Sequence, residues 1–262
     1  MNTFSIREAV KFGWGAVKGN IGFFVILSVL ILSVSFGAEM VNEFRSLNES
    51  SVLSLVVHVL LLVLNLILSI WAIRVGLDVV DAKKPSFANF LPSWEVVWKF
   101  VFSNILVALI VVVPSMLILG ALRLLVVGSV VSLAALPTFG PLSLILLGVL
   151  ILLLIFVLIY FGTRFMFATY YVVDQKLGPV ESIRASWRTT RGVVWKLVGL
   201  IFVLAFINMI GVLAFVVGVL VTIPISLVAS AYVYRSLVGD LNAVPTPAGD
   251  LVEPVPTPTM GQ

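Results

Sequence analysis

Residues that could carry covalent or metal chemistry are few in this chain. Its 262 residues include no Cys and a single His, His58. The lack of Cys excludes disulfides, thiolate metal sites and Cys nucleophiles, and one His excludes a multi-His metal site or a His-pair relay. The sequence also has no phosphate-binding loop, dinucleotide fingerprint or metal-ligand spacing. We therefore expect no cofactor, no metal and no catalytic activity of the chain's own.

Three arginines form the most distinctive charged group. Arg184 and Arg188 are four residues apart, and Arg191 follows within the next turn. Like charges at this spacing destabilise a helix, so their presence favours an anionic partner, for which phospholipid headgroups are the nearest candidates. Trp187, on an adjacent face, would anchor such a helix at the membrane–water interface. The alternative interpretation is that the three charges only set the topology of the chain.

Four polar side chains interrupt the apolar runs: His58, Asn65, Asn104 and Asn208. His58 and Asn65 are seven residues apart and therefore share a helical face. Hydrogen bonding between helices is the simpler interpretation, and a path for a proton or solute is the alternative. Pro114 and Pro224 would suit broken spans of the kind found in transporters. No Asp or Glu lies near the middle of an apolar run, which weakens the transport interpretation.

The composition indicates which solvent surrounds these residues. Hydrophobic residues make up 61% of the chain, and its 16 basic and 12 acidic residues amount to only 11%. A soluble domain is about 25% charged, so this chain has too little polar surface to be soluble. We expect an all-α polytopic integral membrane protein, a bundle of transmembrane helices. The net charge of +4 fits loops that face an anionic leaflet, and we expect no nucleic-acid partner.

Runs without charged residues locate the membrane spans. They cover 19–38, 50–73, 100–122, 124–163 and 197–234. A span needs about 20 apolar residues, so the first three runs hold one span each. The last run is nearly twice as long and is expected to turn at 208–211, where Asn and Gly occur.

The 124–163 run divides differently because Pro137 and Pro141 interrupt it. We expect an interfacial or re-entrant piece over 124–136, followed by one span. The six expected spans are about 19–38, 51–76, 98–121, 142–166, 193–209 and 213–236.

The distribution of basic residues predicts the orientation. With six spans and the N-terminus in the cytoplasm, every Lys and Arg except Arg45 and Arg123 lies on the cytoplasmic side. This asymmetry follows the positive-inside rule and predicts a plasma-membrane protein with both termini cytoplasmic. Residues 1–240 would form a single transmembrane domain, and 241–262 a disordered, Pro-rich cytoplasmic tail. Asn48 begins a glycosylation sequon in a predicted outer loop.

A short amphipathic stretch precedes each pair of spans, which predicts an internal repeat. Aligning the first stretch with the third matches Trp14 with Trp187 and Lys18 with Arg191. The middle copy matches less well, although Lys99 falls at the position of Lys18. The expected unit is a short interfacial helix followed by a helical hairpin, repeated three times.

The segment 171–192 contains Val-Val-Asp174, then Gly178, then Ser186 and Thr190 in a Ser-x-x-x-Thr spacing. This pattern resembles a signature of a broad group of uncharacterised bacterial and archaeal six-span membrane proteins. That group is similar to the membrane domain attached to some glycerophosphoryl diester phosphodiesterases. In those enzymes the chemistry belongs to a separate soluble domain, which this chain lacks. The resemblance therefore implies a membrane location and argues against an intrinsic esterase.

Together these features favour a non-catalytic membrane-organising or accessory component. It would act through membrane lipids, whose anionic headgroups would meet the basic interfacial helices, or through a protein partner in the membrane. The alternative is a transporter or channel for a small solute.

Overall fold

A computed structural model describes residues 4–47, 52–87, 90–131 and 141–239, and these residues form helices and connecting segments without any strand. The helices are α1 (Ile6–Gly19), α2 (Ile21–Leu47), α3 (Val52–Val80), α4 (Trp94–Val131), α5 (Pro141–Phe165), α6 (Ala168–Gln175), α7 (Pro179–Thr189), α8 (Val194–Leu213) and α9 (Phe215–Val238). The all-α prediction is confirmed. The expected tail, 241–262, and the sequon at Asn48 lie outside the described residues.

Six stretches of the described helices are long and apolar enough to cross a membrane. They are Ile21–Val41, Leu55–Val80, Trp94–Leu124, Leu144–Gln175, Val194–Leu213 and Gly218–Val238. The expected number of spans is therefore confirmed, and each expected span overlaps one of these stretches. The chain is a multi-pass helical membrane protein.

Two boundaries differ from the sequence prediction. No separate element begins at Leu124, because α4 continues as one helix of 38 residues to Val131; residues 132–140 lie outside the described part. The turn expected at 208–211 lies instead at Ala214, the one residue between α8 and α9. Pro114 and Pro224 both lie inside continuous helices.

Pro224 leaves one carbonyl of α9 without its helical partner, and another helix supplies the replacement. Proline has no N–H, so the carbonyl of Leu220, four residues earlier, loses its hydrogen bond. The buried Ser28 hydroxyl of α2 donates to this oxygen over 2.8 Å. The proline is thus tolerated because a neighbouring helix satisfies the freed backbone group.

This arrangement predicts a specific dependence between the two positions. Ser28→Ala should lower the free energy of unfolding by about 1–3 kcal/mol, because it leaves the Leu220 carbonyl unpaired. In a Pro224→Ala background the restored N–H can bond this carbonyl, so the same substitution should cost much less. Unfolding of the four proteins of this double-mutant cycle in mild detergent, followed by Trp fluorescence, gives the coupling. An equal cost of Ser28→Ala in both backgrounds would contradict this account.

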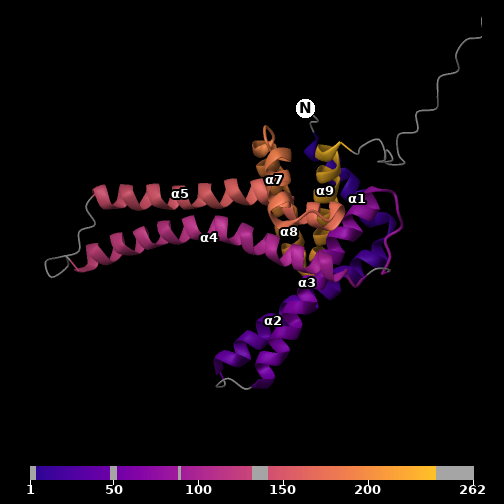
Figure 1. Cartoon of the computed structure of the whole chain (residues 1–262), viewed down its shortest axis with the longest axis horizontal. Helices are drawn as coiled ribbons and strands as arrows, with labels where there is room; N and C mark the ends of the chain where they lie inside the picture. Colours follow the sequence, from indigo (N-terminus) through magenta and orange to yellow (C-terminus); the bar gives the residue numbers. More distant parts are fainter. Residues whose placement is uncertain (1–3, 48–51, 88–89, 132–140, 240–262) are drawn as a thin grey trace, which may run out of the picture.

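The long helices form three hairpins that diverge from a shared base. The α4–α5 hairpin and the α2–α3 hairpin extend from this base in different directions (Figure 1). In the apolar windows of α4 and of α5–α6 only 6% of the residues are buried, whereas 44% are buried in that of α9. Most of the α4–α5 surface is therefore left to lipid or to another membrane protein.

The base is built from the short helices and the adjoining ends of the long ones, and we call it the basic end. α1 packs on α9, and α7 packs on α4, α5 and α6. The segment between α3 and α4 has no helix in its described residues, yet it packs on the α2–α3 hairpin. Phe87 lies 5.3 Å from the Trp71 ring and 4.9 Å from that of Phe23, and Phe90 also contacts Trp71.

These contacts follow one rule. The segment before α4 lies on the α2–α3 hairpin of the first unit, and α7 lies on the α4–α5 hairpin of the second unit. The first segment, α1, lies on the α8–α9 hairpin of the third unit. The three units therefore close into a ring at the basic end, which supports the predicted repeat. The middle copy differs from the other two, because its connecting segment is not a separate helix and α4 begins directly at Trp94.

Candidate functional site

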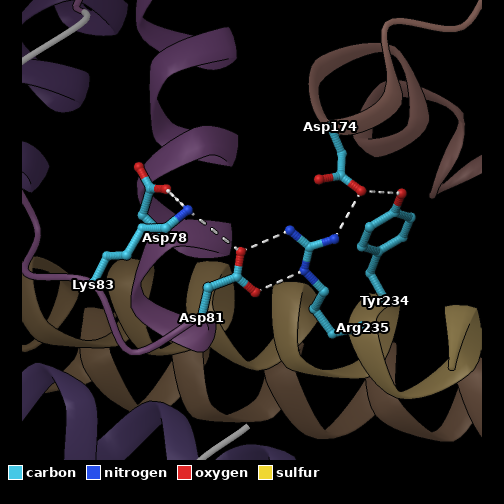
Figure 2. A network of polar contacts seen from close by, with 6 residues as sticks. All are labelled: Asp78, Asp81, Lys83, Asp174, Tyr234 and Arg235. Atoms are coloured by element: carbon cyan, nitrogen blue, oxygen red, sulfur yellow. Dashed lines mark hydrogen bonds and ion pairs between the residues drawn. The ribbon is translucent and has the colours of Figure 1, made fainter. Parts of the chain in front are cut away.

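Asp174 joins the end of α6 to α9 at the basic end. It is the next-to-last residue of α6, and its Oδ2 accepts hydrogen bonds from the Tyr234 hydroxyl over 2.9 Å and from Arg235 Nη1 over 2.8 Å. The resemblance marked Asp174 without giving it a role. Figure 2 shows that the residue faces Tyr234 and Arg235, both on α9.

Arg235 is the centre of this network. Its side chain binds Asp81 in a two-pronged pair, with Nε to Oδ1 at 2.9 Å and Nη2 to Oδ2 at 2.8 Å (Figure 2). Arg235 is only 8% exposed. Lys83 adds a third cation–carboxylate contact, because its Nζ lies 3.8 Å from Asp81 and 3.3 Å from Asp78. We call Asp81, Asp174, Tyr234 and Arg235 the ion lock.

The ion lock connects three elements rather than exposing a reactive group. Asp81 directly follows α3, Asp174 is the next-to-last residue of α6, and Arg235 lies near the end of α9. Every guanidinium nitrogen of Arg235 is engaged by a carboxylate, the pairing that a planar fork favours. The arrangement therefore fixes the relative position of α3, α6 and α9. Within the described residues no group of three or more His, Asp or Glu could hold a metal ion.

The Ser-x-x-x-Thr pair has a structural role at the end of α5. Both hydroxyl-bearing residues are buried. Ser186 Oγ donates to the Arg164 carbonyl over 2.7 Å, and Thr190 Oγ1 donates to the Ser186 carbonyl over 2.8 Å. The last carbonyls of a helix lack intrahelical partners, so Ser186 caps α5 from α7. This capping stabilises the end of α5, where the chain leaves α5 and enters α6.

Gly178 also serves local structure. It is the residue before α7, its N–H donates to Glu181 Oε2 over 3.2 Å, and Pro179 is the first helical residue. This is the helix start that its sequence suggests. The left-handed residue of this connection is Lys176, with φ 52°, rather than the glycine.

Trp187 is less available than the sequence suggested. It is half-buried, and the Arg164 guanidinium carbon lies 4.5 Å from its ring centre. The rings of Tyr160, Phe161 and Phe165 surround it at 5.7–6.3 Å. Trp187 thus covers the cation of Arg164, the kind of contact that aromatic faces make with guanidinium groups. Its predicted contact with lipid remains a prediction.

The three arginines of the predicted headgroup contact remain exposed. Arg184 and Arg188 lie on α7, and α7 ends at Thr189, so Arg191 lies in the turn that leads to α8. None of the three forms an ion pair with another described residue. Glu181, the one acidic residue of α7, has its carboxylate on the Gly178 amide. The outer surface here is therefore strongly positive.

The structure does not join the polar residues of the apolar runs. Asn65 and Asn104 are exposed on α3 and α4, and Asn104 donates to the Phe100 carbonyl of its own helix. Asn208 donates to the Leu204 carbonyl and to Ser226 Oγ of α9, both over 2.9 Å. The His58 Nδ1 atom has no hydrogen-bond partner in the described part of the chain. No described hydrogen bond connects any two of these four residues, and the pairing of Asn208 with Ser226 is the interhelical bond that the simpler interpretation predicted.

Fold and site together define a multi-pass helical membrane protein with an ion-locked base and a basic outer helix. Comparison of the chain with protein-family models, with curated proteins and with solved structures finds no match. The interpretation of its function therefore depends on its own residues.

Sequence reasoning missed Asp81 and Arg235 as partners. The structure gives Asp78 a contact with Lys83. One signal for the ion lock was present: Asp81 and Arg235 both stand where a long apolar run meets the basic end. Opposite charges at equal depth on two spans favour a pair.

Proposed function

We propose that this protein is a non-catalytic membrane-organising or accessory component of the plasma membrane. It acts through anionic lipids at its basic end, or through a protein partner that these contacts help to position. The observation that carries the proposal is the set of exposed arginines without ion-pair partners among described residues, Arg184, Arg188 and Arg191.

Electrostatics supports a lipid partner for this surface. Arg184 and Arg188 repel each other across one helical turn, and no described carboxylate offsets the repulsion. An anionic leaflet would offset it, with about 1 kcal/mol for each basic residue near the surface. α7 packs on α4, α5 and α6, two of which are membrane-spanning helices, so we expect its exposed guanidinium groups close to the level of headgroups.

Orientation belongs to the same proposal. The basic residues other than Arg45 and Arg123 gather on the side of α1, α6 and α7, and the positive-inside rule assigns that side to the cytoplasm. Both termini are then cytoplasmic. The resemblance to the membrane domain of glycerophosphoryl diester phosphodiesterases also supports an accessory role, because that domain is distinct from the catalytic one.

Lipid selectivity in reconstituted bilayers tests the proposal. Spin-labelled phosphatidylglycerol should be immobilised by the protein more than spin-labelled phosphatidylcholine. Arg184→Gln with Arg188→Gln should lower the relative association of phosphatidylglycerol about fivefold or more, because each basic residue contributes about 1 kcal/mol.

Lys18→Gln with Lys84→Gln is the matched control, because it removes two exposed charges from other parts of the same end. This pair should change the ratio much less. An unchanged preference in the α7 variant, or an equal loss in the control, would rule out α7 as the lipid-contacting element.

A further inference from the structure

A groove lies between α5 and α8, outside the ion lock and the α7 surface. Its volume is about 260 Å³, and its lining side chains are apolar apart from the Tyr160 hydroxyl and the Trp195 indole N–H. The lining residues are Leu152, Ile155, Phe156, Ile159 and Tyr160 from α5, and Val194, Trp195, Val198 and Phe202 from α8. The groove runs along two membrane spans, so its natural occupant is a membrane component.

One end of the groove lies at the basic end, near the end of α5 and the start of α8. Tyr160 and Trp195 line that end, and Trp195 is 76% exposed. Tyr and Trp are concentrated where the hydrocarbon meets the headgroups, because their rings are apolar and their polar atoms need water or headgroup partners. An acyl chain in this groove would therefore begin at Tyr160 and Trp195 and continue toward Leu152.

Basic residues lie close to this mouth in the chain. Arg164 Nη2 donates to the Tyr160 hydroxyl over 3.2 Å, and Arg164 Nη1 lies 3.4 Å from Thr190 Oγ1. These contacts bring the turn after Thr190, which contains Arg191, to the mouth of the groove. Lys196, in the first turn of α8, is exposed like Arg191, and neither forms an ion pair with a described residue.

Tyr160 adds a polar contact at the same place. Its hydroxyl accepts hydrogen bonds from Arg164 Nε and Nη2, so its own hydrogen is left to donate. No described residue accepts this hydrogen. A phosphate or ester oxygen at the mouth would supply the acceptor.

We infer that the α5–α8 groove is a binding site for one anionic phospholipid. One acyl chain lies along the groove, and the phosphate lies at its mouth, near Arg191 and the Tyr160 hydroxyl. The charges favour an anionic over a zwitterionic headgroup, because from α7 through α8 Glu181 is the single carboxylate and its oxygen is on the Gly178 amide. This inference rests on the proposed function and names a single held lipid.

A single acyl chain is thinner than a helix of about 10 Å diameter and can follow the groove lengthwise.

Native mass spectrometry of the full chain released from mild detergent tests the inference. After equal exposure to phosphatidylglycerol and phosphatidylcholine, the wild-type protein should retain one phosphatidylglycerol per chain. Val198→Trp should abolish retention of that lipid by filling the groove, whereas Val203→Trp, on the same helix but outside the lining, should retain it. Arg191→Gln with Lys196→Gln should weaken retention of phosphatidylglycerol about tenfold and leave phosphatidylcholine unchanged.

Each contrary outcome is specific. Equal retention by the two Trp variants would place the lipid elsewhere, and equal retention of both headgroups would overturn the role of Arg191 and Lys196. A dimer without lipid, lost in Val198→Trp, would show that a second copy occupies the groove. The Arg191 and Lys196 variant is confined to exposed positions, so it decides the question even if Val198→Trp does not fold. Failure here with an intact effect of Arg184 and Arg188 on bulk lipid selectivity would leave the proposed function standing.

Discussion

Arg235→Met is expected to lower the free energy of unfolding by about 3–5 kcal/mol. The substitution keeps much of the apolar volume of the side chain and removes the charge that Asp81 and Asp174 share. The largely buried Asp174 would then lack its cation, and Asp81 would keep only the exposed Lys83 at 3.8 Å. Leaving a buried charge uncompensated costs more than the intact pair contributes, which gives this large value.

Denaturant or thermal unfolding in mild detergent, followed by Trp fluorescence, measures this effect. Lys83→Met is the matched control, because the Lys83 side chain is 63% exposed and such pairs contribute at most about 1 kcal/mol. Adding Asp81→Asn and Asp174→Asn to Arg235→Met should recover part of the loss, because the stranded charges are then gone. If the triple variant is less stable than Arg235→Met alone, uncompensated charge is not the cause.

Gly218→Ala is expected to disrupt the α8–α9 hairpin. A Cβ atom at Gly218 would lie 2.3 Å from the Gly211 oxygen and 2.8 Å from its Cα atom, and both belong to backbone. The two helices would have to separate, and overpacking of this kind costs about 1–3 kcal/mol. This cost exceeds the gain of about 1 kcal/mol that alanine brings to a helix interior.

Gly148→Ala in α5 supplies the control for this substitution. No atom lies within 4 Å of a Cβ placed there, so this variant should keep or raise the stability. Thermal unfolding of the two variants side by side measures the difference. A Gly218→Ala protein as stable as Gly148→Ala would show that the close approach of α8 and α9 is not required.

The number of spans was predictable because lipid imposes a simple rule on the sequence. An apolar run must be long enough to cross and must exclude charges, and both properties can be counted. The end of α8 was harder to locate. Asn208 looks like a turn residue, but its amide bonds the Leu204 carbonyl and Ser226. Gly211 serves close packing against Gly218 and Thr222 rather than a turn.

The extent of α4 was mispredicted for a related reason. Of the two prolines that predicted a break, Pro141 begins α5, and Pro137 lies outside the described residues. The residues between Leu124 and Val131 include Gly128 but no proline, however, and α4 continues through them. The two prolines lie too far along the chain to have ended α4 at Leu124.

The ion lock could not be derived from local pattern. Asp81 and Arg235 are 154 positions apart, and their pairing depends on how α3 packs on α9. The resemblance singled out Ser186 and Thr190, but their capping of Arg164 became visible only when α5 and α7 came together. The exposed arginines of α7, by contrast, were predictable because they depend on the sequence of one short helix.

The closed ring at the basic end has a consequence for biosynthesis. The ribosome releases α1 first and α9 last, yet α1 buries Ala9, Gly13 and Val17 against α9. Gly13 has the closest fit, because a Cβ there would lie 2.8 Å from the Ile225 oxygen. The face of α1 that packs on α9 therefore stays uncovered until α9 has been synthesised. A nascent chain stopped before α9 would leave that face of α1 uncovered, so quality control at the membrane could distinguish it from the finished protein.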